Sequence, residues 1–301
     1  MTSPITSFKS GFVGIIGKPN VGKSTLLNHL ISNKLAATSN RPQTTRNKIT
    51  GVCHVPGGQI VLLDTPGIHE STAKFNLHLV QTALRVYKDV DLILFLIDAQ
   101  GKFSSEDQYV LDTMRHVKVP KVLVVNKIDL IPKLEVLPLM ADFATSGEFV
   151  EIVPVSALTS EGLDVLKEVI LKHLPEGPQY FPLDMVTDCP ENFIIAEIIR
   201  EKIMRLTHME LPHAVAVVVE SVREGHGGYT VIDATIYTEK VSQRKILIGE
   251  KGSMLKKLGS SARLEIEKRF GSKVFLSLHI KVKKNWKVDD HSLREFGYSN
   301  D

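Results

Sequence analysis

The sequence predicts two domains of different class, a doubly wound α/β domain with a mostly parallel sheet and a smaller α+β domain after it. From Phe12 to about His173, short aliphatic runs alternate with helix-length segments, which is the βαβ rhythm of a parallel sheet. Between Leu174 and Phe193, four prolines interrupt any periodic pattern. At about 100–200 residues per domain, a chain of 301 residues has room for two.

Five apolar runs mark the predicted strands of the first domain. None of them alternates polar with apolar residues, as expected for strands that helices cover on both faces. The runs are FVGIIG from Phe12, QIVLLD from Gln59, DLILFLID from Asp91, KVLVVN from Lys121 and EIVPVS from Glu151. A helix is expected over Ser24–Asn33, shortly after the first run.

The second domain follows a proline-rich linker. We place the first domain at residues 1–180, the linker at 181–192 and the second domain at 193–301. The elements expected there are a helix over 193–206, strands over 214–223 and 229–238, a short strand ending at 248, a long helix over 253–270 and a strand over 274–282. This order describes an α+β module.

Composition limits the class of protein. The 43% hydrophobic and 24% charged residues are typical of a globular chain. The longest apolar stretches, such as Leu92–Ile97, are far shorter than the roughly 18 residues of a membrane-spanning helix, and we expect no leader before Phe12. The two cysteines, Cys53 and Cys189, argue against a disulfide scaffold or a zinc site and fit a reducing cytoplasm.

Charge is distributed unevenly along the chain. Of 37 basic and 34 acidic residues, 14 basic and 3 acidic ones fall within residues 240–287. This segment therefore carries a net charge of +11, and the rest of the chain carries −8. A basic segment on an acidic body indicates a polyanionic partner, while a solvated helix face with scattered lysines is the alternative.

Residues 17–24, GKPNVGKS, fit the pattern G-x-x-x-x-G-K-[ST] between a predicted strand and a predicted helix. In such a loop, backbone N–H groups surround phosphate oxygens and the dipole of the following helix favours negative charge. We expect Lys23 to reach the β- and γ-phosphates and Ser24 to coordinate Mg²⁺. The predicted nucleotide-binding residues here are Gly17, Lys18, Pro19, Asn20, Val21, Gly22, Lys23, Ser24 and Thr25.

A second motif, Asp64-Thr65-Pro66-Gly67, follows the strand QIVLLD. Asp64 would stand at the carboxyl end of this strand and hold the metal shell, and Gly67 can offer its N–H to a γ-phosphate. Hydrolysis would remove that contact. The segment from Ile68 to Asn76 is therefore a candidate switch, and Ile68 completes the predicted nucleotide-binding residues of this loop.

A third motif, Asn126-Lys127-Ile128-Asp129, identifies the base. Guanine presents two parallel N–H donors that a carboxylate such as Asp129 can accept together, whereas adenine lacks this edge. Asn126 would join this loop to the phosphate loop, and the stem of Lys127 can cover the purine. Ser156 and Ala157 would supply a backbone N–H to guanine O6. A kinase that uses ATP is disfavoured by Asp129 and by the lack of a second acidic catalytic motif.

A further motif lies in the basic segment. Residues 248–252 contain G-x-x-G, which we place between a strand and a basic helix; three other matches, at 11–14, 14–17 and 225–228, precede no such helix. Glycines there let a nucleic-acid backbone approach, so we expect single-stranded RNA to bind. Trp286 is interpreted as a packing residue. The predicted RNA-binding residues are Ile248, Gly249, Glu250, Lys251, Gly252, Lys256 and Lys257.

Together, GKPNVGKS, Thr44-Thr45-Arg46, DTPG, NKID and SAL resemble the Era family of bacterial GTPases, and the C-terminal half resembles that family's KH domain. The resemblance covers essentially the whole chain. It implies an α/β P-loop GTPase domain followed by an α+β type II KH domain, with GTP or GDP and Mg²⁺ as ligands. It also implies a cytoplasmic protein that binds 16S rRNA near its 3′ end and acts in 30S subunit maturation. We expect a monomer, because nothing in the sequence demands an oligomer, and we expect no binding to DNA. A peripheral fraction at the inner membrane stays open.

The resemblance also assigns roles. Thr45 is the expected switch I threonine of the Mg²⁺ shell, with Thr44 as the alternative. The metal set is then Ser24, Thr45 and Asp64, and the catalytic set is Lys23, Thr45 and Gly67.

Where Ras-like GTPases place a glutamine after DTPG, this chain has Ile68, which cannot orient a water molecule. Hydrolysis is therefore expected to be slow and to depend on a partner, a rearranged switch or a bound cation. Asn20 matches the asparagine with which related GTPases hold K⁺, which predicts stimulation by K⁺. A rival function also stays open, a GTPase whose basic C-terminal face docks on an anionic membrane or on a protein.

Overall fold

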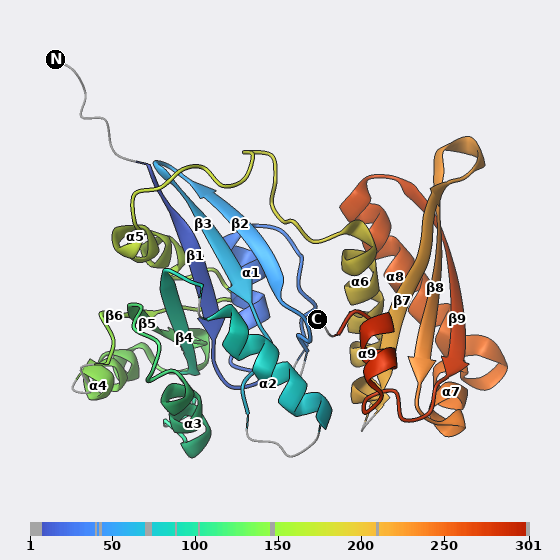
Figure 1. The fold of residues 1–301 in the computed structure, drawn as a ribbon, viewed down its shortest axis with the longest axis horizontal. Helices are drawn as coiled ribbons and strands as arrows, with labels where there is room; N and C mark the ends of the chain where they lie inside the picture. Colours follow the sequence, from blue (N-terminus) through green and yellow to red (C-terminus); the bar gives the residue numbers. More distant parts are fainter. Residues whose placement is uncertain are drawn as a thin grey trace. The chain divides into compact units, whose positions relative to one another are not determined.

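The computed structural model describes residues 8–39, 41, 44–69, 74–87, 89–101, 103–144, 148–208 and 211–298. The chain divides into two compact units (Figure 1). The first extends to Ala36 and resumes after Arg41 as far as Asp188, and the second takes residues 37–41 together with the chain from Cys189.

The first unit contains a six-stranded sheet in the order β2-β3-β1-β4-β5-β6. Neighbouring strands are parallel, apart from the antiparallel pair β2 and β3. The predicted mostly parallel sheet is thus confirmed. The strands are β1 (Lys9–Ile16), β2 (Ile49–Val55), β3 (Gly58–Asp64), β4 (Leu92–Asp98), β5 (Lys121–Asn126) and β6 (Glu151–Pro154).

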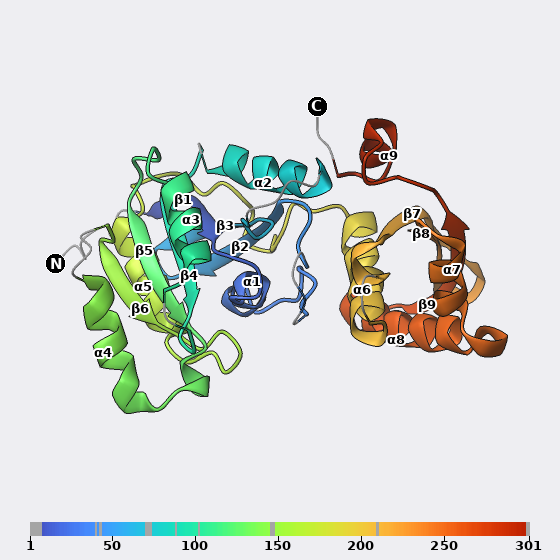
Figure 2. The ribbon, with the colours of Figure 1, turned by 90° about the horizontal axis from the view of Figure 1, so that it is seen from below.

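Helices cover both faces of this sheet, which explains its uniformly apolar strands. Figure 2 shows α1 on one side of the sheet and α2 on the other. Side chains from α2 and α3 form a buried cluster with Val61, Ile93 and Phe95. The helices are α1 (Lys23–Leu30), α2 (Lys74–Val86), α3 (Ser105–Thr113), α4 (Lys133–Ala144) and α5 (Leu163–His173).

Strand β2 does not appear among the predicted strands. It joins β3 through a tight turn that contains Gly57 at φ 75°, and this hairpin makes the pair antiparallel. Helix α1 is also shorter than expected and ends at Leu30, because Ser32 adopts a left-handed conformation at φ 53°. The Asn28 side chain then holds the returning chain by accepting from the N–H groups of Leu35 and Ala36.

The proline-rich segment after α5 contains no helix or strand before Glu191, as predicted. Part of it packs on the first unit. The Val186 carbonyl accepts from the N–H of Val52, and Gln59 Oε1 accepts from the N–H groups of Tyr180 and Phe181 at 2.9 and 3.0 Å.

The second unit contains a three-stranded sheet in the order β7-β8-β9, with β7 and β8 antiparallel and β8 and β9 parallel. Its chain order is α-β-β-α-α-β, followed by a short terminal helix. The elements are α6 (Glu191–Leu206), β7 (Val215–Glu224), β8 (Tyr229–Thr238), α7 (Val241–Ile248), α8 (Ser253–Phe270), β9 (Lys273–Val282) and α9 (Asp290–Glu295).

The prediction of a short strand ending at Ile248 was wrong, because these residues form helix α7. Gln243 Oε1 accepts from the backbone N–H groups of Glu239 and Lys240, which stabilises the start of the helix. Gln243 and Leu247, one helical turn apart, are the buried positions. Three consecutive apolar residues, Ile246 to Ile248, are typical of a strand, but Ile246 is exposed.

Trp286 is fully buried, as expected of a packing residue. Its indole N–H donates to the Ala214 carbonyl at 3.3 Å, and its ring packs against Phe296 and Tyr298. It therefore has no face exposed for stacking on a base. Over the described ranges, every helix is too short or too polar to cross a membrane.

Candidate functional site

The phosphate loop connects β1 to α1, and its two outer glycines have no room for a side chain. A Cβ on Gly17 would lie 2.6 Å from the Leu96 carbonyl oxygen. A Cβ on Gly22, at φ 101°, would lie 2.2 Å from Asn126 Nδ2. The loop backbone is therefore pressed against β4 and β5, and the first N–H groups of α1 border it, as in a phosphate-binding turn.

Lys23 is a buried cation at the centre of this loop. Its Nζ donates to the carbonyls of Gly17 and Lys18 at 3.0 and 2.9 Å. Burial lowers the pKa of Lys23 to about 8, and the nearby Asp64 carboxylate partly offsets this effect. A buried ammonium group held by two carbonyls is prepared to bind phosphate oxygens.

Three oxygen side chains converge beside Lys23. The Ser24 hydroxyl donates to Asp64 Oδ2 at 2.7 Å and lies 2.6 Å from the Thr45 hydroxyl, which itself donates to Asp64 at 3.1 Å. They come from α1, from the segment before β2 and from the end of β3.

The buried Asp64 Oδ1 has no hydrogen-bond partner among the described residues, and burial raises the pKa of this carboxyl against the opposing effects of Lys23 and the two hydroxyls. An unpaired carboxylate oxygen beside two hydroxyls is the hard donor set that Mg²⁺ prefers. The residues fit this ion, and Thr45 contacts both other members of the set, which supports its choice over Thr44.

The DTPG loop passes directly over the phosphate loop. A Cβ on Gly67 would lie 2.9 Å from the Pro19 nitrogen and 3.1 Å from Lys23 Nζ, so only glycine lets the two backbones approach this closely. Ile68 is fully buried in the apolar cluster beneath α2. It therefore offers no polar group to a water molecule.

Asn126 joins the base-recognition loop to the phosphate loop. It is buried, its Nδ2 donates to the Val21 carbonyl at 2.7 Å, and its Oδ1 accepts from the Ala157 N–H at 2.9 Å. That N–H, predicted to reach guanine O6, is thus engaged within the protein, and a base would have to share it. Lys127 Nζ bonds Asp98 at 2.6 Å, while Asp129 is exposed on a 3₁₀ turn (Ile128–Leu130).

Lys18 points away from the phosphate position. Its Nζ donates to Asp107 Oδ2 at 2.8 Å and to the Ser104 hydroxyl at 3.0 Å at the start of α3. Its backbone is part of the loop, but its side chain anchors the loop to α3. Sequence reasoning missed Asp107, although the spacing of Ser104 and Asp107 is that of a capping box.

The G-x-x-G loop lies between α7 and α8 rather than after a strand. Gly249 and Gly252 have φ angles of 72° and 82°, and Lys251 between them has a φ of 49°. A Cβ on Gly249 would lie 2.7 Å from Met254, whereas nothing lies within 4 Å of one on Gly252. Glu250 and Lys251 are exposed, so the outer side of the loop is open to a ligand.

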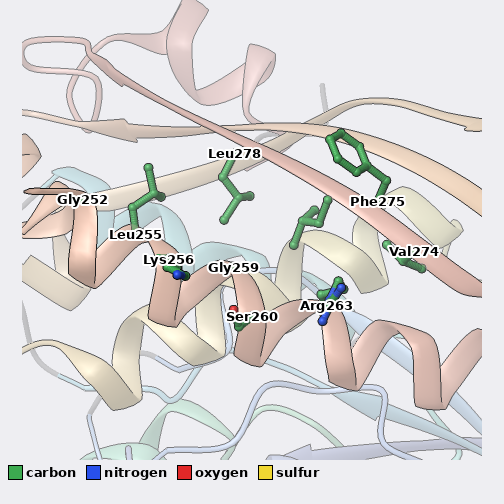
Figure 3. A pocket seen from close by; sticks show the side chains of 10 residues that line it. Gly252, Leu255, Lys256, Gly259, Ser260, Arg263, Val274, Phe275 and Leu278 are labelled. Atoms are coloured by element: carbon green, nitrogen blue, oxygen red, sulfur yellow. The ribbon is translucent and has the colours of Figure 1, made fainter.

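A groove of about 500 Å³ extends from this loop between α8 and β9 (Figure 3). Its α8 wall carries Lys256 and Arg263 on either side of Gly259, and its β9 wall is apolar. Lys257, also predicted here, is exposed but does not line the groove. The lining residues are Gly252, Leu255, Lys256, Gly259, Ser260, Arg263, Val274, Phe275, Leu276 and Leu278.

The sequence reasoning did not identify the apolar wall on β9. A signal existed, because Gly259 and Ser260 are small residues in the middle of a helix, where they leave space opposite the strand. An apolar groove with cations at its edge and a glycine loop at its end suits unpaired nucleotides.

Comparisons with known proteins match two different families to two parts of the chain. The family described as "50S ribosome-binding GTPase" matches residues 12–127, and the family described as "KH domain" matches residues 210–287. The chain is 51% identical over 293 residues to the "GTPase Era" of Geobacter metallireducens and 50% identical over 291 residues to that of Geotalea uraniireducens. Each alignment covers 97% of this chain and 98% of the relative.

Two solved structures are similar over nearly the whole chain. One is a variant of Aquifex aeolicus Era bound to GDP and aluminium fluoride, and the other is Era in complex with MgGDPNP and nucleotides 1506–1542 of 16S ribosomal RNA. Each is 40% identical, with a TM-score of 0.94, and the match covers 97% of this chain and 100% of the other.

Proposed function

The chain belongs to the Era family of GTPases, and from this premise we propose that its KH unit binds 16S rRNA near the 3′ end while its first unit binds and hydrolyses GTP. The protein is a GTPase that converts GTP to GDP and phosphate and uses Mg²⁺. We also propose which residues perform each step, that the bound RNA is 16S rRNA, and that the protein acts in maturation of the 30S subunit.

In the first unit we assign phosphate binding to the loop of residues 17–24, with Lys23 reaching the β- and γ-phosphates. Ser24, Thr45 and Asp64 would hold Mg²⁺, which would supply positive charge to offset that of the phosphates. Gly67 would donate its N–H to the γ-phosphate. Asn126 keeps the base loop and the phosphate loop in register, and Asp129 would accept the two N–H donors of guanine.

The observation that carries the RNA assignment is the groove between α8 and β9. It begins at Gly252, beside the exposed Lys251, and Lys256 and Arg263 line it. These cations suit a phosphate backbone, and the apolar β9 wall suits bases. The solved Era complex with a 16S rRNA fragment supports the same ligand for this chain.

We propose that the protein acts as a monomer in the cytoplasm, where rRNA is assembled into subunits. The rival is docking of the basic face on an anionic membrane or a protein. A groove with a glycine loop at one end is the observation that favours RNA, because a lipid surface requires only a basic face.

The test is to crosslink the chain to RNA in cells and to sequence the attached RNA. A variant with Glu250 and Lys251 both changed to Asp replaces the one positive side chain of the loop, which takes its net charge from 0 to −2, and retains both of its glycines. A matched control, Lys133→Gln, alters a lysine of α4 whose side chain is 92% exposed. We expect enrichment at the 3′ end of 16S rRNA that disappears in the loop variant and persists in the control. Absent enrichment, or an unchanged signal in the loop variant, would favour lipid or protein docking.

For the first unit we propose slow intrinsic hydrolysis that K⁺ accelerates. Ile68 supplies no polar group, so another element has to compensate charge in the transition state, and Asn20 is exposed on the phosphate loop. Single-turnover hydrolysis should be faster in KCl than in NaCl at equal ionic strength, and Asn20→Ala should remove the difference. A fast rate in both salts would contradict the proposal.

A further inference from the structure

Tyr87 places a hydroxyl group inside the apolar core of the GTPase unit. The residue follows α2 directly, and its side chain is 1% exposed within the cluster that contains Ile16, Leu63 and Phe95. A Cβ on Gly14 would lie 3.3 Å from the Tyr87 ring, so the ring lies against the backbone of β1. A phenylalanine would fill the same space without a polar group to satisfy.

The hydroxyl of Tyr87 pairs with that of Thr65, the second residue of DTPG. The two oxygens are 2.5 Å apart, and Thr65 is fully buried. The Thr65 hydroxyl also donates to the Ile15 carbonyl at 3.4 Å, so Tyr87 is the donor of the pair when both bonds form. Burial raises the pKa of Tyr87, which keeps the phenol protonated and able to donate.

This chain of hydrogen bonds ends close to the phosphates. Ile15 pairs with Asp64 across β1 and β3, and Thr65 follows Asp64. Gly67 comes two residues later and lies against Pro19 and Lys23. Tyr87 thus connects the end of α2 to the start of the loop that carries Gly67.

We propose that Tyr87 is a positioning residue, which holds Thr65 so that the Gly67 N–H points to the γ-phosphate. This inference rests on the proposed contact between Gly67 and that phosphate. GDP lacks the γ-phosphate, so Tyr87 governs the preference for GTP over GDP and the hydrolysis rate, and it leaves GDP affinity unchanged. A residue that only stabilised the fold would not separate the two nucleotides.

The experiment measures the affinity of the full-length chain for GDP and for a non-hydrolysable GTP analogue, together with single-turnover hydrolysis. Tyr87→Phe retains the ring and removes the donor. We expect the ratio of GTP-analogue to GDP affinity to fall about fivefold, as the loss of one buried hydrogen bond predicts. Tyr180→Phe is the matched control, because this half-exposed tyrosine of the same unit packs on Phe12 and should leave the ratio unchanged.

Thr65→Val provides the second arm, since it keeps the β-branched shape and removes the acceptor. Its ratio should fall as well, and adding Tyr87→Phe to it should cause no further loss. Equal loss of affinity for both nucleotides, an unchanged ratio or additive losses in the double variant would overturn the role of Tyr87.

Gly67→Ala separates this inference from its premise. A ratio that drops in Gly67→Ala and not in Tyr87→Phe would overturn the role of Tyr87 alone. An unchanged ratio in Gly67→Ala would show that the γ-phosphate contact itself is wrong, and the proposal for Tyr87 would fall with it.

Discussion

At the GTP site, the pKa values of single side chains depend on burial as much as on neighbouring charges. Lys23 and Asp64 are both buried, and burial disfavours the charged form of each, lowering the pKa of the lysine and raising that of the carboxyl. The charge of each group partly offsets the effect of burial on the pKa of the other. Asp129 differs, because it is exposed. We therefore expect phosphate binding to depend on the burial of Lys23 and Asp64, and base recognition to depend on the exposed carboxylate of Asp129.

The pKa of Lys23 gives nucleotide binding a pH dependence. Without nucleotide the pKa is about 8, and bound phosphates favour the charged form and raise it. Binding then takes up a proton, so the affinity for a GTP analogue should fall as the pH rises through about 8, by up to about tenfold per pH unit. Titration between pH 7 and 9 tests this. Lys23→Arg should remove the dependence, because arginine stays charged, and an equal slope in both proteins would contradict the assignment.

Asp129 should determine the choice of base. Asp129→Asn removes a charged acceptor of two N–H donors, so GTP affinity should fall by about ten- to a hundredfold, while affinity for xanthosine triphosphate should rise. Competition binding with both nucleotides measures the change. Asp112→Asn, at a half-exposed aspartate of α3, is the control and should change neither affinity. A retained preference for GTP in Asp129→Asn would exclude this residue from base recognition.

At the scale of elements, the GTP site depends on loops that approach one another without intervening side chains. The phosphate loop touches β4 at Gly17, the base loop at Gly22 and the DTPG loop near Gly67. Parallel strands bring these loops together, because their carboxyl ends meet at one edge of the sheet. The glycines are required by this convergence, which joins residues from distant parts of the chain.

Gly22→Ala tests this requirement. The new Cβ would combine a left-handed φ of 101° with a 2.2 Å approach to Asn126, so unfolding should become easier by about 3 kcal/mol and nucleotide affinity should collapse. Gly57→Ala is the matched control. It has a φ of 75° with nothing within 4 Å of its Cβ, and should cost only about 1–2 kcal/mol without changing nucleotide affinity. Equal effects of both substitutions, measured by chemical denaturation and GDP binding, would show that the contact with Asn126 is unimportant.

At the scale of the whole molecule, the chain connects its two units more than once. Residues 37–41 belong to the second unit, where the Thr38 N–H donates to the buried Glu201 and Arg205 donates to the Thr38 hydroxyl at 3.0 Å. Arg41 donates to the Thr207 carbonyl. Thr45 follows four residues after Arg41 and belongs to the proposed Mg²⁺ set of the first unit. The proposed metal site is therefore close in sequence to a segment that the KH unit holds.

The cations at the G-x-x-G loop and along the groove predict how RNA binding responds to salt. If Lys251, Lys256 and Arg263 contact phosphates, the affinity for a short RNA from the 3′ end of 16S rRNA should fall with salt, with a log–log slope of about −2. Lys256→Gln should reduce the magnitude of this slope by about 0.7, whereas Lys133→Gln in the GTPase unit should not change it. A slope near zero would argue against phosphate contacts.

The sequence by itself determined the two-domain organisation, the mostly parallel sheet and the use of GTP. Each rests on a motif or a period within a short stretch of chain, such as residues 17–24 or Asn126 to Asp129, where spacing alone defines the chemistry. The sequence also identified the G-x-x-G loop, but it predicted a strand where α7 lies. Three consecutive apolar residues fit either a helix or a strand, and only the packing shows that Gln243 and Leu247 are the buried residues.

Only the tertiary structure decided which distant groups meet. It brought Thr45 to Ser24 and Asp64, turned Lys18 towards Asp107, opposed α8 to the apolar wall of β9 and paired Tyr87 with Thr65. These pairs are separated by up to 89 residues in sequence. No local pattern specifies them, because their distances depend on how the whole sheet and its helices pack.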